Sequence, residues 1–278
     1  MTYEERAKII EQFEIEGKFN DNIEQDPEFK PLQARKINFG NKGVMGRLLS
    51  YISTRAGKKF FDGMMKKKIV VLKEPTGYEN LEGFDEGAII TCNHFHHFDN
   101  YAALLAIKGY FKKTRLFRVI REGNYAIPGV VGFLMRNCDT LPVSNDGSNP
   151  RLTVMCMNAV AELLQNKNNK VLIYPEQSMW WNYRKPRPMK AGAFMFAAKA
   201  KKPIIPCFIT LKDSDIIGGD GAPVQEFTVN ILPIIKYNEA ESTKENAERM
   251  MNENYNLWKE CYEKTYGIPL VYKTKNKD

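Results

Sequence analysis

Beyond residue 69, short apolar runs alternate with segments of helical periodicity, and this alternation limits the folds open to the chain. Helices that separate successive strands cover the faces of a sheet whose strands run mainly parallel. We therefore predict an α/β fold: a single mixed, largely parallel sheet flanked by helices, with an N-terminal helical appendage. The predicted strands lie at 69–72, 88–92, 115–121, 170–174, 203–210 and 225–235, and the predicted helices at 98–110, 150–166, 190–201 and 242–266.

The region before the first strand is mainly helical and changes from acidic to basic along its length. Residues 2–18 predict a polar helix, 21–33 a connection that contains proline and aspartate, and 44–66 a basic helix. No internal repeat or low-complexity linker divides the rest of the chain. We predict a basic, membrane-associating helical appendage at 1–68 and one catalytic domain at 69–278.

The net charge of +8 suits an anionic partner, and the positive charge is concentrated in residues 35–73. Large apolar side chains lie between the basic residues of this stretch, among them Met45, Leu48, Ile52 and Phe60. Such a helix can lie in the interface of an anionic membrane, or it can pack its apolar side on the domain and leave its lysines in water. No nucleic-acid-binding motif is recognisable, so we predict anionic membrane lipids as partners and no nucleic acid.

Two further features bear on the compartment. No run of about 18 apolar residues predicts a membrane-spanning helix, and the acidic N-terminus lacks the apolar core of a signal peptide. We expect a cytoplasmic protein, peripheral at the inner face of the cell membrane. The five cysteines are scattered and form no CxxC pair, which favours free thiols over a disulfide framework or a structural zinc site.

The three histidines of the chain all fall within residues 90–99, where an apolar run ends. Asp99 follows His94 by five positions, a separation that points the two side chains apart on a regular helix. They can therefore meet only across a turn between a strand and a helix. An imidazole oriented by a carboxylate can take a proton from a hydroxyl near neutral pH, so the pattern favours a general base.

A second carboxylate, Glu176, follows Pro175 at the end of the predicted strand 170–174. Ligands of parallel sheets bind beyond the carboxyl ends of the strands, so Glu176 is placed where a site residue belongs. A third block, 202–210, reads as a buried strand with two prolines and carries no chemistry of its own.

Taken in order, these three blocks resemble the glycerolipid acyltransferase family, also called PlsC-like or lysophosphatidic acid acyltransferases. Asn93, His94 and Asp99 match the family's Asn-His-x-x-x-x-Asp block, and Pro175 and Glu176 match the start of its Pro-Glu-Gly-Thr block. The flanking runs 87–90, 190–193 and 202–206 also look like the family, so the resemblance covers roughly residues 70–210.

The resemblance implies acyl transfer from acyl-CoA or acyl carrier protein, as co-substrate, to a hydroxyl of a lyso-glycerolipid such as 1-acyl-glycerol 3-phosphate. No cofactor and no metal are implied. His94 would be the general base and Asp99 its orienting partner, as in a serine-protease triad. Asn93, Glu176, Gln177 and Ser178 would position the acceptor, and backbone amides after Asn93 would stabilise the oxyanion.

The chain departs from the family where the family has phosphate-binding arginines. Met179 stands at one such position and Asn145 at the other, and neither side chain can form the bidentate contact of arginine. Either other cations hold the acceptor or the acceptor lacks a phosphomonoester. The candidate cations, of which Arg151 and Lys190 are our choices, are Arg151, Arg184, Lys185, Arg187 and Lys190.

Three rival interpretations can be compared with the residues. A metallohydrolase would use His94, His96, His97 and Asp99 as ligands, but Phe98 and Asp99 stand where its pattern needs Asp and His. The condensation-domain pattern His-His-x-x-x-Asp-Gly fails on spacing. A lipid-binding or membrane-tethering module would keep the fold without the chemistry, and the intact His94 and Asp99 argue against it.

Overall fold

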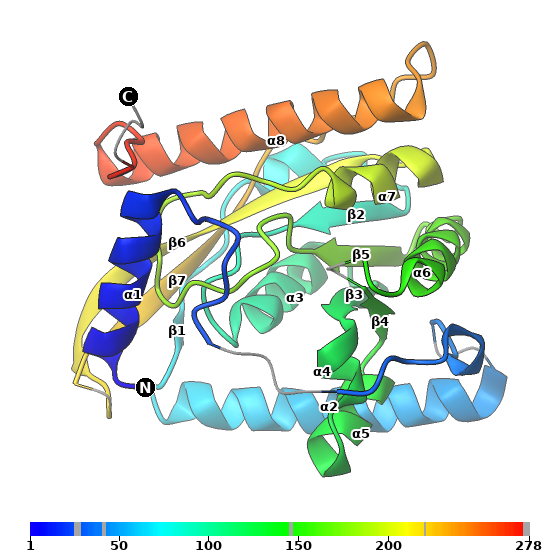
Figure 1. Cartoon of the computed structure of the whole chain (residues 1–278), viewed down its shortest axis with the longest axis horizontal. Helices are drawn as coiled ribbons and strands as arrows, with labels where there is room; N and C mark the ends of the chain where they lie inside the picture. The colour runs from blue at the N-terminus through cyan, green and yellow to red at the C-terminus, as the bar shows by residue number, and fades with distance from the viewer. Residues whose placement is uncertain (25–28, 41–42, 145–146, 220, 275–278) are drawn as a thin grey trace.

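The computed structural model describes residues 1–24, 29–40, 43–144, 147–219 and 221–274, and within them seven strands form one sheet (Figure 1). The strand order is β1-β7-β6-β2-β5-β3-β4, and every neighbouring pair is parallel except β6 and β7. This confirms the predicted mixed, largely parallel sheet. The strands are β1 (Val71–Leu72), β2 (Ala88–Thr91), β3 (Arg115–Arg121), β4 (Thr140–Val143), β5 (Asn169–Ile173), β6 (Ile204–Ile217) and β7 (Pro223–Ile231).

Helices cover both faces of this sheet, as the alternating pattern predicts. One face packs on α6, α7 and α8 through a core that contains Ile89 and Val171. The other face packs on α3 through a core that contains Ile90 and Leu172. The helices are α1 (Tyr3–Glu16), α2 (Gly43–Lys66), α3 (Asp99–Tyr110), α4 (Glu122–Ala126), α5 (Gly129–Asn137), α6 (Pro150–Leu163), α7 (Gly192–Ala200) and α8 (Thr243–Tyr266).

The central strands β2 and β5 are buried on both faces, which explains their continuous apolar sequence. They pair in parallel, with Thr91 opposite Ile173 at their carboxyl ends. The segments that follow the two strands therefore leave the same edge of the sheet side by side. One carries His94 and the other carries Glu176, so the topology brings the predicted blocks together.

The N-terminal segment packs against the segment that follows β5. Ile10, Phe19 and Ile23 form a small core with Trp180, and the rings of Phe19 and Trp180 stack at 5.8 Å. α2 runs across the α3 side of the molecule, beside α5 (Figure 1). The ring of Phe61 in α2 stacks on Tyr101 of α3 at 4.4 Å. The predicted helical N-terminus is confirmed, while a domain division at residue 68 stays a prediction.

Three elements between β3 and α6 had no counterpart in the sequence prediction. β4 is short and contains Pro142, which is tolerated because β4 is the edge strand of the sheet. α4 and α5 are also short, and two glycines, Gly129 and Gly132, lower the helix propensity of α5. Among the described helices, none combines the length and the apolar composition needed to cross a bilayer.

Candidate active site

His94 and Asp99 meet across the turn that joins β2 to α3. β2 ends at Thr91 and α3 begins at Asp99, which is the strand-to-helix turn that their spacing predicts. Nδ1 of His94 lies 2.7 Å from Oδ2 of Asp99. The Asp99 side chain is fully buried, whereas that of His94 is 23% exposed. The pairing leaves Nε2 as the imidazole nitrogen directed away from the carboxylate.

The Asp99 carboxylate is held by several donors besides His94. The backbone amides of Phe95 and His96 donate to Oδ2 at 3.1 and 3.2 Å, and the Tyr174 hydroxyl donates to Oδ1 at 2.7 Å. Burial alone would raise the pKa of Asp99, but the imidazole of His94 and these hydrogen bonds lower it below its usual value. Asp99 therefore stays ionised and fixes the orientation of the ring.

Tyr174 is a site residue that the sequence analysis did not single out. Its ring stacks on the imidazole of His94 with centroids 4.1 Å apart, and its hydroxyl bonds Asp99. Burial and the charge of Asp99 raise the pKa of this phenol, so it acts as a donor. A signal was available, because Tyr174 follows the buried strand that precedes Pro175 and Glu176.

Glu176 is buried, and both its oxygens are engaged by the protein. Oε2 accepts from the backbone amide of His94 and from the Arg187 guanidinium, each at 3.0 Å. Oε1 accepts from the backbone amide of Arg187 at 2.7 Å. The side chains of Glu176 and Arg187 are 2% and 1% exposed. Glu176 therefore fixes the backbone of His94 through the hydrogen bond from the His94 amide.

The segment after Glu176 wraps around the same turn. Ser178 is buried and its hydroxyl accepts from Arg187 at 2.7 Å. The amide of Trp180 donates to the carbonyl of His94 at 3.1 Å, and the amide of Asn182 to that of Phe95 at 2.9 Å. These bonds fix the position of His94 through its main chain.

Two other predicted acceptor-binding residues also make contacts within the protein. The Asn93 amide bonds the backbone of Ile209 in β6 twice, at 3.0 Å through Nδ2 and 2.8 Å through Oδ1. Gln177 has a φ of +63°, a left-handed conformation that glycine adopts most readily. The family's glycine at this position thus has a conformational reason, and this chain places a glutamine there.

The first three backbone amides after Asn93 are not available for the expected oxyanion site. The amide of His94 donates to Glu176, and those of Phe95 and His96 donate to Asp99. Each of the three protons is aimed at a carboxylate, so none is directed at a substrate oxygen.

Three of the five candidate cations are paired with acids. Arg184 contacts Asp213 at 2.6 Å, Lys185 contacts Glu14 at 2.5 Å, and Arg187 contacts Glu176. These three candidates are therefore engaged by acids of the protein itself.

Lys190 and Arg151 remain exposed. The backbone of Lys190 lies beside the site, since its amide donates to the carbonyl of Pro175 at 2.8 Å. Arg151 lies in the first turn of α6, the helix that follows the edge strand β4. Met179 is half-buried, and Asn145 lies outside the described residues.

The other two histidines have different surroundings. The ring of His96 packs on Trp181 at 4.3 Å, and its Nδ1 accepts from the amide of Phe98 at 3.2 Å. Burial lowers the pKa of His97. Within the described residues, no three His, Cys, Asp or Glu side chains gather at a spacing suited to a metal ion.

This geometry can be compared with known proteins. Residues 74–210, the stretch that carries both blocks of the site, match the model of the acyltransferase family. Residues 74–210 of the chain are an acyltransferase-family region. The resemblance based on His94, Asp99 and Glu176 is thereby confirmed at the level of the family.

Individual acyltransferases are more distant. A chloroplastic 1-acyl-sn-glycerol-3-phosphate acyltransferase of Brassica napus is 31% identical over 130 residues, which are 47% of this chain and 35% of that protein. The chain thus spans about a third of that relative. The crystal structure of the 1-acyl-sn-glycerophosphate acyltransferase PlsC from Thermotoga maritima superposes with a TM-score of 0.50 over 81% of each chain, at 17% identity. That likeness shows a shared fold.

Proposed function

We propose that this acyltransferase moves a fatty acyl group from an acyl thioester, acyl-CoA or acyl carrier protein, to a hydroxyl of a lyso-glycerolipid such as 1-acyl-glycerol 3-phosphate. The observation that carries the proposal is the 2.7 Å contact between Nδ1 of His94 and Asp99, with Nε2 left for a substrate. The acceptor named for the Brassica napus relative supports a lyso-glycerolipid.

In the proposed reaction, Nε2 of His94 takes the proton of the acceptor hydroxyl as its oxygen attacks the thioester carbon. A C–O bond forms, the C–S bond breaks, and the departing thiolate receives the proton back from the imidazolium. Asp99 holds the ring in the required tautomer and stabilises its positive charge. Each step uses groups of this chain and of the two substrates.

In this proposal Glu176, Ser178 and Asn93 act as positioning residues, since their side chains bind the protein rather than face outward. Lys190 is then the cation best placed to attract an anionic acceptor, because it is exposed and its main chain joins the Pro175 segment. A phosphomonoester would take the place of the solvent around its ammonium group.

The proposed acceptor and product are lipids, so the protein must meet a bilayer. α2 and α5 lie in contact and together expose apolar side chains, which we call the α2–α5 face. Arg47, Arg55, Lys58 and Lys59 in α2 are exposed beside it. We propose that this face rests on an anionic membrane surface at the cytoplasmic side. Its members are Val44, Met45, Leu48, Tyr51, Ile52, Val130, Val131 and Phe133.

The proposal is tested by a transfer assay on purified protein with labelled palmitoyl-CoA and palmitoyl carrier protein. The acceptors are glycerol 3-phosphate, lysophosphatidic acid, other lysophospholipids and an unphosphorylated lysolipid. We expect ester formation with a lyso-glycerolipid and a loss of about 10²–10⁴-fold in His94→Ala. Folded protein that binds vesicles but transfers to no acceptor would instead identify a membrane-tethering module.

A further inference from the structure

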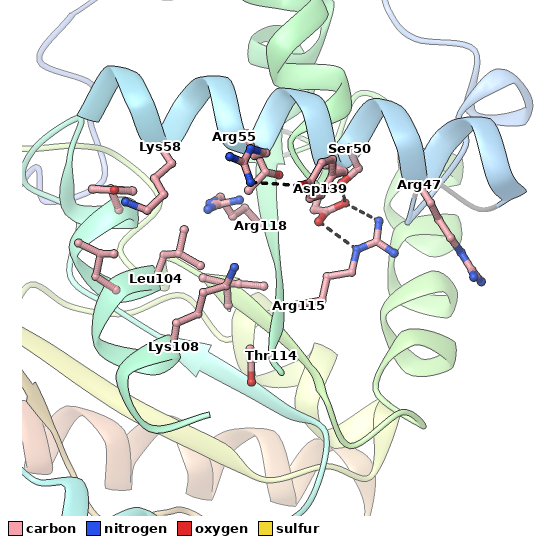
Figure 2. Close-up of a pocket in the computed structure, with 15 residues that line it drawn as sticks. Arg47, Ser50, Arg55, Lys58, Leu104, Lys108, Thr114, Arg115, Arg118 and Asp139 are labelled. Atoms are coloured by element: carbon pink, nitrogen blue, oxygen red, sulfur yellow. Dashed lines mark hydrogen bonds and ion pairs between the residues drawn. The ribbon is translucent and has the colours of Figure 1, made fainter. Parts of the chain in front are cut away.

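A cavity of about 470 Å³ lies between α2 and the sheet, apart from the candidate active site (Figure 2). α2, α3 and β3 supply most of its lining. Tyr101, two positions after Asp99 in α3, lines the cavity, whereas His94, Asp99 and Glu176 do not. The cavity is therefore a separate space next to the site.

Its charge is strongly one-sided. Among the described residues that line it, Asp139 is the only acid, and that carboxylate is already engaged. Arg115 donates to it at 3.0 Å through Nε and at 2.5 Å through Nη2, and the Ser50 hydroxyl donates at 2.5 Å. The basic residues that line the cavity are Arg47, Arg55, Lys58, Lys108, Arg115 and Arg118.

Three of these cations face the hollow without an acidic partner. The charged ends of Arg55, Lys108 and Arg118 point into it from α2, α3 and β3, while Arg47 points away (Figure 2). Arg55 donates to the Tyr51 hydroxyl at 3.1 Å, and Arg118 to the carbonyl of Cys138 at 3.0 Å. Within the described chain, no Asp or Glu forms an ion pair with any of the three.

Two observations indicate that the protein alone does not offset the charge of these cations. Nε of Arg118 is buried and has no hydrogen-bond partner among the described residues. Burial lowers the pKa of Lys108, and the neighbouring charge of Arg118 lowers it further. Like charges gathered in a partly desolvated space are unfavourable, and an anion placed between them would offset that cost.

The uncharged part of the lining includes three leucines, Leu104, Leu105 and Leu116, together with tyrosine, serine and threonine side chains. A ligand that contacts both the basic residues and the leucines of this cavity needs an oxyanion at one end and hydrocarbon at the other. We propose that this cavity binds the phosphate ester group of an amphiphile, with the phosphate between Arg55, Lys108 and Arg118 and the apolar part against the leucines. Guanidinium groups suit phosphate because they can donate two parallel hydrogen bonds.

The test is titration calorimetry on the full chain without any acyl donor, so that the result does not depend on acyl transfer. The probes are dihexanoyl phosphatidic acid, glycerol 3-phosphate and dihexanoylglycerol. The variants are Lys108→Met and Arg118→Met, which keep side-chain length and remove charge. Lys113→Met is the matched control, because Lys113 is exposed just beyond α3 and does not line the cavity.

We expect the phosphatidic acid to bind more tightly than glycerol 3-phosphate, and dihexanoylglycerol to bind least. The affinity for dihexanoyl phosphatidic acid should fall about tenfold or more in Lys108→Met, because that is the loss expected for one charged hydrogen bond. It should stay unchanged in Lys113→Met. Arg118→Met should behave like Lys108→Met once an unchanged circular dichroism spectrum shows that it folds. Equal affinity of wild type and folded Lys108→Met would overturn the site, and equal affinity for both phosphate probes would overturn the amphiphile.

Discussion

The Tyr174 hydroxyl donates a 2.7 Å hydrogen bond to Oδ1 of Asp99, the carboxylate whose other oxygen contacts His94 at 2.7 Å. The Tyr174 phenol thus helps to lower the pKa of the carboxylate that faces the imidazole. It contacts the His94 ring itself only by stacking. It is a positioning residue in the proposed mechanism, since it acts on the base through Asp99.

Removing this hydroxyl should change the pH dependence of catalysis. The bond from Tyr174 helps to lower the pKa of Asp99, so Tyr174→Phe makes the carboxylate more basic. A more basic Asp99 holds the His94 imidazolium more tightly, and the acidic limb of kcat/KM should move to higher pH. One hydrogen bond of about 0.5–1.5 kcal/mol corresponds to up to about one pH unit.

Tyr78→Phe is the control for this measurement, because the Tyr78 hydroxyl donates to the carbonyl of Ala106 at 3.0 Å, away from Asp99. Its profile should match the wild type. If the acidic limb of Tyr174→Phe stays in place or moves to lower pH, Tyr174 does not act on the base through Asp99.

The sequence predicted the parts of the site that are local in the chain. His94 and Asp99 are five positions apart, so a single turn decides whether they meet, and the end of an apolar run marks that turn. Tyr174 and Arg187 were harder, since their roles depend on the parallel register of β2 and β5 and on a long segment folding back. The sequence offered Arg187 only as one of five candidate cations for the acceptor, whereas the structure buries it beside Glu176.

The same distinction holds for the fold. Long periodic segments such as 242–266 were predicted nearly to the residue, because α8 spans Thr243–Tyr266. The stretch 122–143 was not resolved into α4, α5 and β4, since each is short and two glycines and Pro142 disturb the pattern. These three elements pack on α2 and β3, and such tertiary contacts cannot be seen in the local sequence pattern.

The buried pair of Glu176 and Arg187 should show strong coupling. Arg187→Met removes the positive charge beside the buried Glu176 side chain, and Glu176→Gln leaves the buried guanidinium without its counter-charge. Each single change should lower the free energy of unfolding by about 3–5 kcal/mol. The double variant should lose less than the sum, as measured by urea denaturation in a double-mutant cycle. Strict additivity would show that the two side chains do not interact energetically.

A substitution at Gln177 is expected to stabilise the protein rather than destabilise it. Its left-handed φ of +63° is strained for a side-chain-bearing residue, and glycine relieves that strain. Gln177→Gly should raise the free energy of unfolding by about 1 kcal/mol, with little change in kcat. Chemical denaturation measures the difference, and Gly17→Ala in the left-handed cap of α1 is the reverse control, expected to destabilise. A less stable Gln177→Gly would show that the glutamine side chain contributes contacts that outweigh the strain.

Two sets of variants can separate the apolar and the electrostatic contributions to membrane binding by the α2–α5 face. Leu48→Glu with Val131→Glu places two acids on exposed apolar positions of α2 and α5 and should abolish most sedimentation with anionic vesicles. Reversing the charge at Lys58, Lys59, Lys66 and Lys67 should weaken binding mainly at low salt, because surface charges are screened at high ionic strength. Val154→Glu is the control, since Val154 is 50% exposed on α6, which covers the opposite face of the sheet from α3. Sedimentation that falls equally in the control and in the α2–α5 variant, or in neither, would remove this face from the proposed membrane contact.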